Sequence, residues 1–135
     1  MAKENLELRE RLQQIRNALL KLHKTLVDSE RATYEKTFGK IPSPNHFLRL
    51  LTNDPWFAWL HPVSLLIVSM DEALDEKEPL TGEKVEALAK ESIVLLVASE
   101  SGQDFSRHYF EALQRDPDVV FAHAEISRIL NPRKS

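Results

Sequence analysis

Histidine is the most versatile chemical side chain in this sequence, and four of the five histidines fall in two similar segments. Residues 46–61 and 108–123 each begin with His and an aromatic residue, contain an Asp-Pro pair and end with His. Neutral imidazole binds transition metals and haem iron well. A duplicated unit could gather imidazoles around a ligand, which makes His61, His108 and His123 candidate cofactor-binding residues. The alternative is coincidence, because Asp-Pro is a common way to begin a helix.

The usual motifs of catalysis and metal binding are missing from the sequence. There is no cysteine, no Glu-x-x-His pair and no glycine-rich phosphate loop. We therefore predict no metal site and no particular cofactor, and we assign no catalytic residue. The densest polar cluster is Arg107 and His108 near Glu100 and Asp104. It could line a pocket, or it could be a helix start whose charges face water.

The most unusual local composition is Trp56-Phe57-Ala58-Trp59. Large rigid aromatic side chains suit both cores and interfaces. Neighbouring positions on one helix cannot all point inward, so we expect Trp56 and Trp59 to contribute to a contact surface. The alternative is that most of these rings belong to the core.

A long N-terminal helix, residues 1–38, is expected to support these groups. It contains no glycine or proline from residue 5 onward, and apolar residues recur at alternating four- and three-residue steps. That spacing is typical of an amphipathic helix. At 1.5 Å per residue the helix would reach roughly 50 Å, long for so small a domain. We therefore expect its seam to pair with a second copy, or alternatively to pack on its own domain; the seam residues are Leu12, Ile15, Leu19, Leu22 and Leu26.

The remaining residues, 43–132, are predicted to form a helical core that completes a single domain over 1–135. Helix starts are indicated at Ser43-Pro44, Asp54-Pro55, Thr81 and Asp116-Pro117, with a capping box at Ser101 and Asp104. The apolar runs Val63–Met70 and Ile93–Ala98 could also be buried strands. They continue without a turn signal into charged helical stretches, which favours helix, and we expect one helix over Gly82–Ser99. The fold class is all-α, a bundle of about five or six helices.

Composition and charge narrow the class of partner. The formal net charge is −3, which gives no reason to expect nucleic-acid binding. The charged N-terminus and the break at His61-Pro62 in the longest apolar run argue against a signal peptide and a membrane partner, so we expect a cytoplasmic protein. Residues 1–40 carry an excess of three positive charges and residues 71–91 an excess of five negative charges. These regions could associate within one molecule or between two, or each could simply face water.

Two stretches carry a resemblance to known sequences. Residues 54–72, which begin Asp-Pro-Trp-Phe-Ala-Trp-Leu-His-Pro, and residues 112–120 look like a group of uncharacterised bacterial all-helical proteins. The resemblance implies a bacterial source and a helical domain. It brings no activity, substrate or site residue.

Three functions follow from these features. The first is a non-enzymatic, self-associating helical module, a homodimer that also binds a protein partner. The second is a helical bundle that binds a small ligand or cofactor, such as a metal or haem, near the three histidines. The third is an enzyme that uses Arg107, His108 and a neighbouring carboxylate.

Overall fold

The computed structural model describes residues 2–132, and this part of the chain consists of helices and the loops between them, with no strand. The α-helices are α1 (Ala2–Phe38), α2 (Pro44–Asn53), α3 (His61–Asp75), α4 (Gly82–Leu95), α5 (Phe105–Arg115) and α6 (Pro117–Leu130). A 3-10 helix, η1 (Pro55–Leu60), joins α2 directly to α3. The predicted all-α class and the long N-terminal helix are confirmed.

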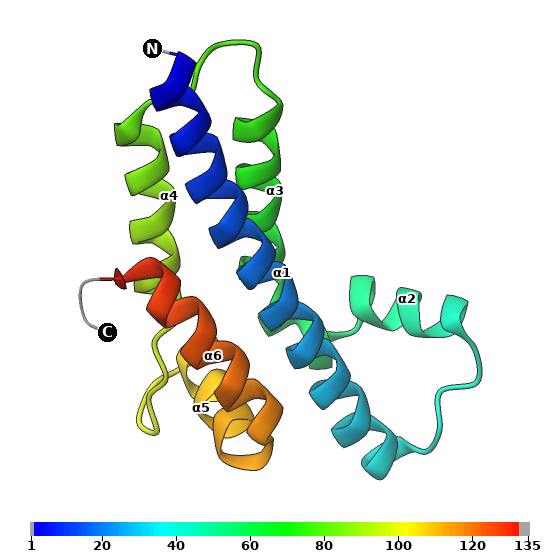
Figure 1. Ribbon diagram of the computed structural model, residues 1–135. Helices are drawn as coiled ribbons and strands as arrows, with labels where there is room; N and C mark the ends of the chain where they lie inside the picture. Colours follow the sequence, from blue (N-terminus) through cyan, green and yellow to red (C-terminus); the bar gives the residue numbers. More distant parts are fainter. Residues whose placement is uncertain (1, 133–135) are drawn as a thin grey trace.

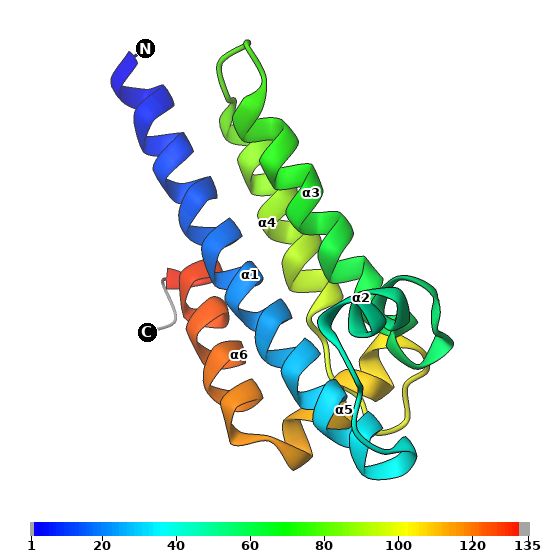
Figure 2. The same cartoon turned by 90° about the vertical axis from the view of Figure 1, so that its right-hand side faces the viewer.

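Helix α1 is the axis around which the others are arranged (Figures 1 and 2). The α3–α4 hairpin lies beside its N-terminal half, and α5 and α6 lie beside its C-terminal half. Helix α1 contacts α3, α4, α5, α6 and η1. Helix α2 projects from this bundle and packs mainly on η1 (Figure 1). Helix α1 therefore takes part in most of the helix–helix contacts of the bundle.

The apolar seam of α1 is the centre of the core. Five of its residues are fully covered: Leu12, Ile15, Leu19, Leu22 and Leu26. The core facing them comes from η1, α3, α4 and the last two helices, and includes Phe57, Met70, Leu88, Tyr109 and Ile126. Burying such side chains stabilises a fold by about 1.5–3 kcal/mol each before the entropic cost of ordering the chain.

Helix starts follow the capping chemistry expected from the sequence. The side chains of Ser43, Asp54, Thr81 and Asp116 each accept a hydrogen bond from a backbone N–H in the first turn of the next helix. Pro62 stands in the first turn of α3, where its missing N–H costs no hydrogen bond. The predicted break at this proline is therefore a change from 3-10 to α-helical winding, with no loop between.

The connection between α4 and α5 differs from the prediction. Helix α4 ends at Leu95 and not at residue 99, because the buried Leu96 leaves helical geometry at ψ 53°. The chain then folds back, and the Ser99 N–H donates to the Ser106 carbonyl at 3.0 Å. The predicted capping box is wrong: Asp104 is the N-cap of α5 at φ 54°, and its side chain accepts no capping bond.

The positively charged region 1–40 and the negatively charged region 71–91 form ion pairs with each other within the molecule. Arg16 Nε lies 2.8 Å from Asp71 Oδ1, and Arg11 Nε lies 3.0 Å from Glu86 Oε1. These pairs join α1 to α3 and to α4. Because they are partly exposed, each contributes at most about 1 kcal/mol, and they act mainly to fix register.

Residues Pro55–Asp75 form an apolar segment of 21 residues whose mean hydropathy of 1.2 meets the length and composition criteria for a membrane span. The interruption expected at His61-Pro62 does not remove it from this class. Core helices of bundles meet the same criteria; here 39% of the apolar window is buried, including Phe57, Val63 and Met70, whereas Leu65 and Val68 are exposed.

Candidate functional site

The three candidate histidines lie in separate surroundings. His61 is exposed at the first residue of α3, and His108 on α5 stacks on Trp59 with 5.3 Å between ring centroids. His123 is half-buried on α6, and its Nδ1 lies 2.6 Å from the Tyr109 hydroxyl. Among residues 2–132, no group of three or more His, Asp or Glu side chains is placed to hold a metal ion. Of the three histidines, His108 is the one that lines the pocket described below.

The expected interface residues are mostly internal. All five seam residues of α1, Leu12 to Leu26, are covered by their own chain. Trp59 is only 8% exposed, whereas Trp56 is half-buried. The chain covers the seam of its long helix without a second copy, so these five residues are not free to contact one.

A hollow of about 440 Å³ brings Trp56 and His108 together, and we call it the Trp56 pocket. Three segments distant in sequence form it: the C-terminal part of α1, the start of η1 and one face of α5. The Asp54-Pro55 cap sets the direction in which the chain enters η1, which places Trp56 at the rim. The lining residues are Glu30, Thr33, Pro55, Trp56, His108, Glu111 and Arg115.

A partly buried ion pair forms one wall of the Trp56 pocket. Arg115 Nη2 donates to Glu30 Oε1 at 2.7 Å, and Arg115 Nε donates to the Ser29 hydroxyl at 3.2 Å. The Glu30 side chain is only 7% exposed, and the Arg115 side chain is 32% exposed. Two of the three guanidinium nitrogens thus form hydrogen bonds within the described residues, and Nη1 forms none there.

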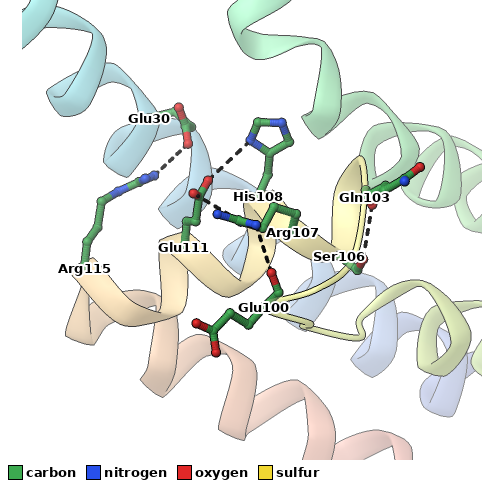
Figure 3. A network of polar contacts seen from close by, with 8 residues as sticks. All are labelled: Glu30, Glu100, Gln103, Ser106, Arg107, His108, Glu111 and Arg115. Carbon is green, nitrogen blue, oxygen red and sulfur yellow. Dashed lines mark hydrogen bonds and ion pairs between the residues drawn. The ribbon is translucent and has the colours of Figure 1, made fainter.

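A second set of polar contacts continues along α5 (Figure 3). Arg107 Nε lies 3.4 Å from Glu111 Oε2, and Arg107 Nη1 donates to the Glu100 carbonyl at 2.9 Å. His108 Nδ1 lies 3.9 Å from Glu111 Oε1, which is beyond hydrogen-bond distance. The cluster singled out in the sequence therefore surrounds Glu111, whose carboxylate pairs with Arg107.

Aromatic rings hold the two tryptophans in place. Trp56 meets Tyr34 and Phe38 edge to face, with ring centroids 5.7 and 5.6 Å apart. The indole Nε1 atoms of Trp56 and Trp59 are both buried without a hydrogen-bond acceptor in the described residues. The edge-on rings beside Trp56 suit such a group, because an N–H can point toward the electron-rich face of a ring. The packed rings leave Trp56 little freedom, so the rim of the pocket is rigid.

Two histidines, His23 and His123, form hydrogen bonds with hydroxyl groups inside the bundle. Burial lowers the pKa of His123 and raises the pKa of Tyr109. His23 Nε2 lies 2.9 Å from the Ser64 hydroxyl, and its pKa is lowered first by burial and then by nearby His61. Both imidazoles are favoured in the neutral form, which serves the packing of α1 on α3 and of α5 on α6.

Sequence reasoning missed Glu30 and Arg115. A signal for Glu30 was present, because continuing the seam of α1 beyond Leu26 by four residues reaches residue 30, a charged residue on a buried stripe. Charged residues are almost never fully buried unless paired, so this position called for a partner. No pattern in the sequence indicated Arg115 as that partner, because the two residues are 85 positions apart.

Comparison of the chain with protein-family models, with curated protein sequences and with solved structures finds no match in any of the three.

Proposed function

We propose that this protein is a binding protein whose Trp56 pocket holds a small polar molecule with a flat apolar part and a hydrogen-bond acceptor. One observation carries the proposal: an ion pair between the buried Glu30 and the partly exposed Arg115 lies in the wall of an open hollow, and Arg115 Nη1 forms no hydrogen bond within the described residues.

The energetics of the ion pair favour a binding role. Removing a charge such as that of Glu30 from water costs several kcal/mol, and well-packed apolar residues in place of an ion pair are often as stable or more so. Burying the Glu30 carboxylate is therefore a poor way to obtain stability alone. Beside a hollow, the ion pair supplies a charged group that is already held in position, which lowers the entropic cost of binding a ligand.

The lining residues indicate the chemistry of the ligand. Glu30 is balanced by Arg115, and Glu111 is balanced by Arg107, so the site has no large excess of either charge. Pro55 and Trp56 offer apolar surface for a flat group. Arg115 Nη1 is the donor available to a carboxylate or carbonyl oxygen. A volume of about 440 Å³ falls within the usual range for small-molecule sites.

A titration with benzoate, a flat ring bearing a carboxylate, tests this proposal. We expect saturable changes at the Trp56 indole and the Arg115 side chain in two-dimensional NMR spectra. Replacing only Arg115 would leave Glu30 buried and unpaired, at a cost of about 3–5 kcal/mol. The informative variant is therefore the double replacement Glu30→Met/Arg115→Met, which removes both charges and is expected to weaken benzoate binding by at least about tenfold.

Arg49→Met is the matched control, because Arg49 lines a separate, smaller hollow beside α2. It should leave benzoate binding unchanged. Benzamidine, of the same shape and opposite charge, should bind more weakly than benzoate. Absence of saturable benzoate binding, equal binding by the double variant, or a preference for benzamidine would each overturn the proposal.

A further inference from the structure

A second hollow adjoins the Trp56 pocket, and the two share part of their walls. It measures about 540 Å³ and lies between α1 and α6, and we call it the α1–α6 hollow. Thr33 and Arg115 line both spaces. Arg115 therefore borders two hollows, and a ligand that contacts it in the Trp56 pocket is next to the second hollow.

The α1–α6 hollow is lined by more negative than positive charge. Its charged lining residues besides Arg115 are Lys21, Asp28, Lys36, Asp116, Asp118 and Glu125. Lys21 Nζ lies 3.4 Å from Glu125 Oε1, and Arg115 pairs with Glu30. Among the described residues, no ion pair takes up the other three carboxylates or Lys36. The hollow therefore favours a positively charged group.

Two of these carboxylates lie beside the wall that the two hollows share. Arg115 Nε donates to the Ser29 hydroxyl at 3.2 Å. Asp116 follows Arg115 in the chain and Asp28 precedes Ser29, so this contact brings both aspartates to the same part of the hollow. Asp116 is held further, because its Oδ1 accepts a hydrogen bond from the Asp118 N–H at 2.9 Å. A guanidinium and two carboxylates are thus close neighbours.

The Trp56 pocket supplies a different set of contacts on its side of the shared wall. Pro55 and Trp56 present apolar surface, and Arg115 Nη1 forms no hydrogen bond within the described residues. A ligand that reaches into both spaces meets a flat apolar surface, a hydrogen-bond donor with positive charge, and a negatively charged lining. Its own groups have to complement all three.

From this arrangement we infer that the ligand is a free amino acid with an aromatic side chain. The inference rests on the function proposed for the Trp56 pocket, and it adds the group that the adjoining hollow selects. The aromatic ring packs on Pro55 and Trp56, and the α-carboxylate accepts a hydrogen bond from Arg115. The α-ammonium group lies toward Asp28 and Asp116. Both charged groups of an amino acid are bonded to one carbon, which suits opposite charges held by neighbouring residues.

An aromatic dicarboxylate does not complement the same lining. Its second carboxylate would enter the α1–α6 hollow, where carboxylates outnumber the unpaired Lys36, and like charges repel. Isophthalate should therefore bind more weakly than L-phenylalanine.

Three probes of similar shape test the inference on the wild-type chain. They are L-phenylalanine, 3-phenylpropionate, which lacks the ammonium group, and 2-phenylethylamine, which lacks the carboxylate. NMR titration of the Trp56 indole signal gives the dissociation constant of each, and of benzoate for comparison. We expect L-phenylalanine to bind at least about tenfold more tightly than the other two, because each of them loses a hydrogen bond between charged groups.

The double variant Asp28→Asn/Asp116→Asn tests the carboxylates. It removes both charges, and asparagine at position 116 keeps an acceptor for the start of α6. We expect the preference for L-phenylalanine over 3-phenylpropionate to fall to about twofold or less. Asp75→Asn is the matched control, because this exposed residue at the end of α3 lines neither hollow, and it should leave the preference unchanged.

The outcomes separate this inference from the function on which it rests. Saturable benzoate binding without a preference for L-phenylalanine over 3-phenylpropionate would overturn the inference and leave the proposed function standing. A preference that survives in the folded double variant, or tighter binding of isophthalate, would also overturn it. If neither benzoate nor L-phenylalanine binds, both the proposed function and the inference are wrong. Circular dichroism checks the fold of the variants, and the comparison of probes on the wild-type chain depends on no variant.

Discussion

The molecule turns the same kind of corner twice, once from α2 into η1 and once from α5 into α6. In both, an Asp-Pro pair separates the helices, and the aspartate accepts a hydrogen bond from the second residue after it: Trp56 N to Asp54 at 2.8 Å, and Asp118 N to Asp116 at 2.9 Å. In both, the N–H of the aspartate also closes the preceding helix, on Leu50 in one and Ala112 in the other. The local chemistry of the two corners is the same.

Their packing is different. Helix α2 contains no buried residue, whereas Phe105, Tyr109 and Ala112 of α5 are buried. Phe47 and Tyr109 occupy the same place in the two segments, yet Phe47 is half-buried and Tyr109 is fully buried. A cap sets where a helix begins, but the neighbours that the rest of the fold supplies decide how much of the helix is covered.

The largest contrast is expected from removing the two aligned rings. Tyr109→Ala deletes a fully buried side chain and its hydrogen bond to His123, so we expect it to lower the free energy of unfolding by about 3–5 kcal/mol. Phe47→Ala should cost about 1–2 kcal/mol, because the ring is only half-buried against Phe57 and Arg31. Urea denaturation of both variants measures the difference. Equal costs would mean that α2 is as firmly packed as α5.

Smaller and equal effects are expected from removing the caps. Asp54→Ala and Asp116→Ala each delete one side-chain acceptor for a helix N-terminus, which costs about 1 kcal/mol. The Asn variants keep an acceptor and serve as controls that should retain most of the stability. A cost at one corner only, measured by the same denaturation, would contradict the view that the two corners share their local chemistry.

The smallest effect is a dependence of stability on pH that belongs to the α5–α6 corner. Burial lowers the pKa of His123 in the folded chain below the ordinary value of 6.5, so below pH 6.5 the unfolded chain binds the proton more readily. The stability due to the neutral imidazole is complete above pH 6.5 and is lost as the pH falls from there through the lowered folded pKa.

We therefore expect the urea midpoint of the wild-type chain to be lower at about pH 5.5 than at about pH 7.5, and His123→Gln to reduce that difference. His23, whose pKa is also lowered, should account for part of what remains. Ile126→Val is the control, because it weakens the same helix without removing a titrating group. An unchanged pH difference in His123→Gln would show that burial of this imidazole does not contribute.

Much of the fold could be predicted from the sequence because its signals are local. The seam of α1 and the Ser-Pro and Asp-Pro starts depend on neighbouring residues, and they locate α1, α2, η1 and α6 closely. The end of α4 was missed because Leu96 leaves the helix to become buried, which depends on packing. Only part of the Trp56 pocket could be predicted from the sequence. Trp56 and His108 were indicated by their residue types, whereas Arg115 is identified only by its contact with Glu30, which the tertiary structure creates.

The central place of α1 also has a consequence for synthesis of the chain. Helix α1 is made first, but the last side chains that cover it are on α6, which contacts it through pairs such as Lys21 and Glu125, 104 residues apart. At about 5–20 residues per second, a ribosome needs several seconds to make the intervening segment. During that time the leucines of the seam are without their final partners. Burial of the α1 seam is therefore completed only after α6 has emerged.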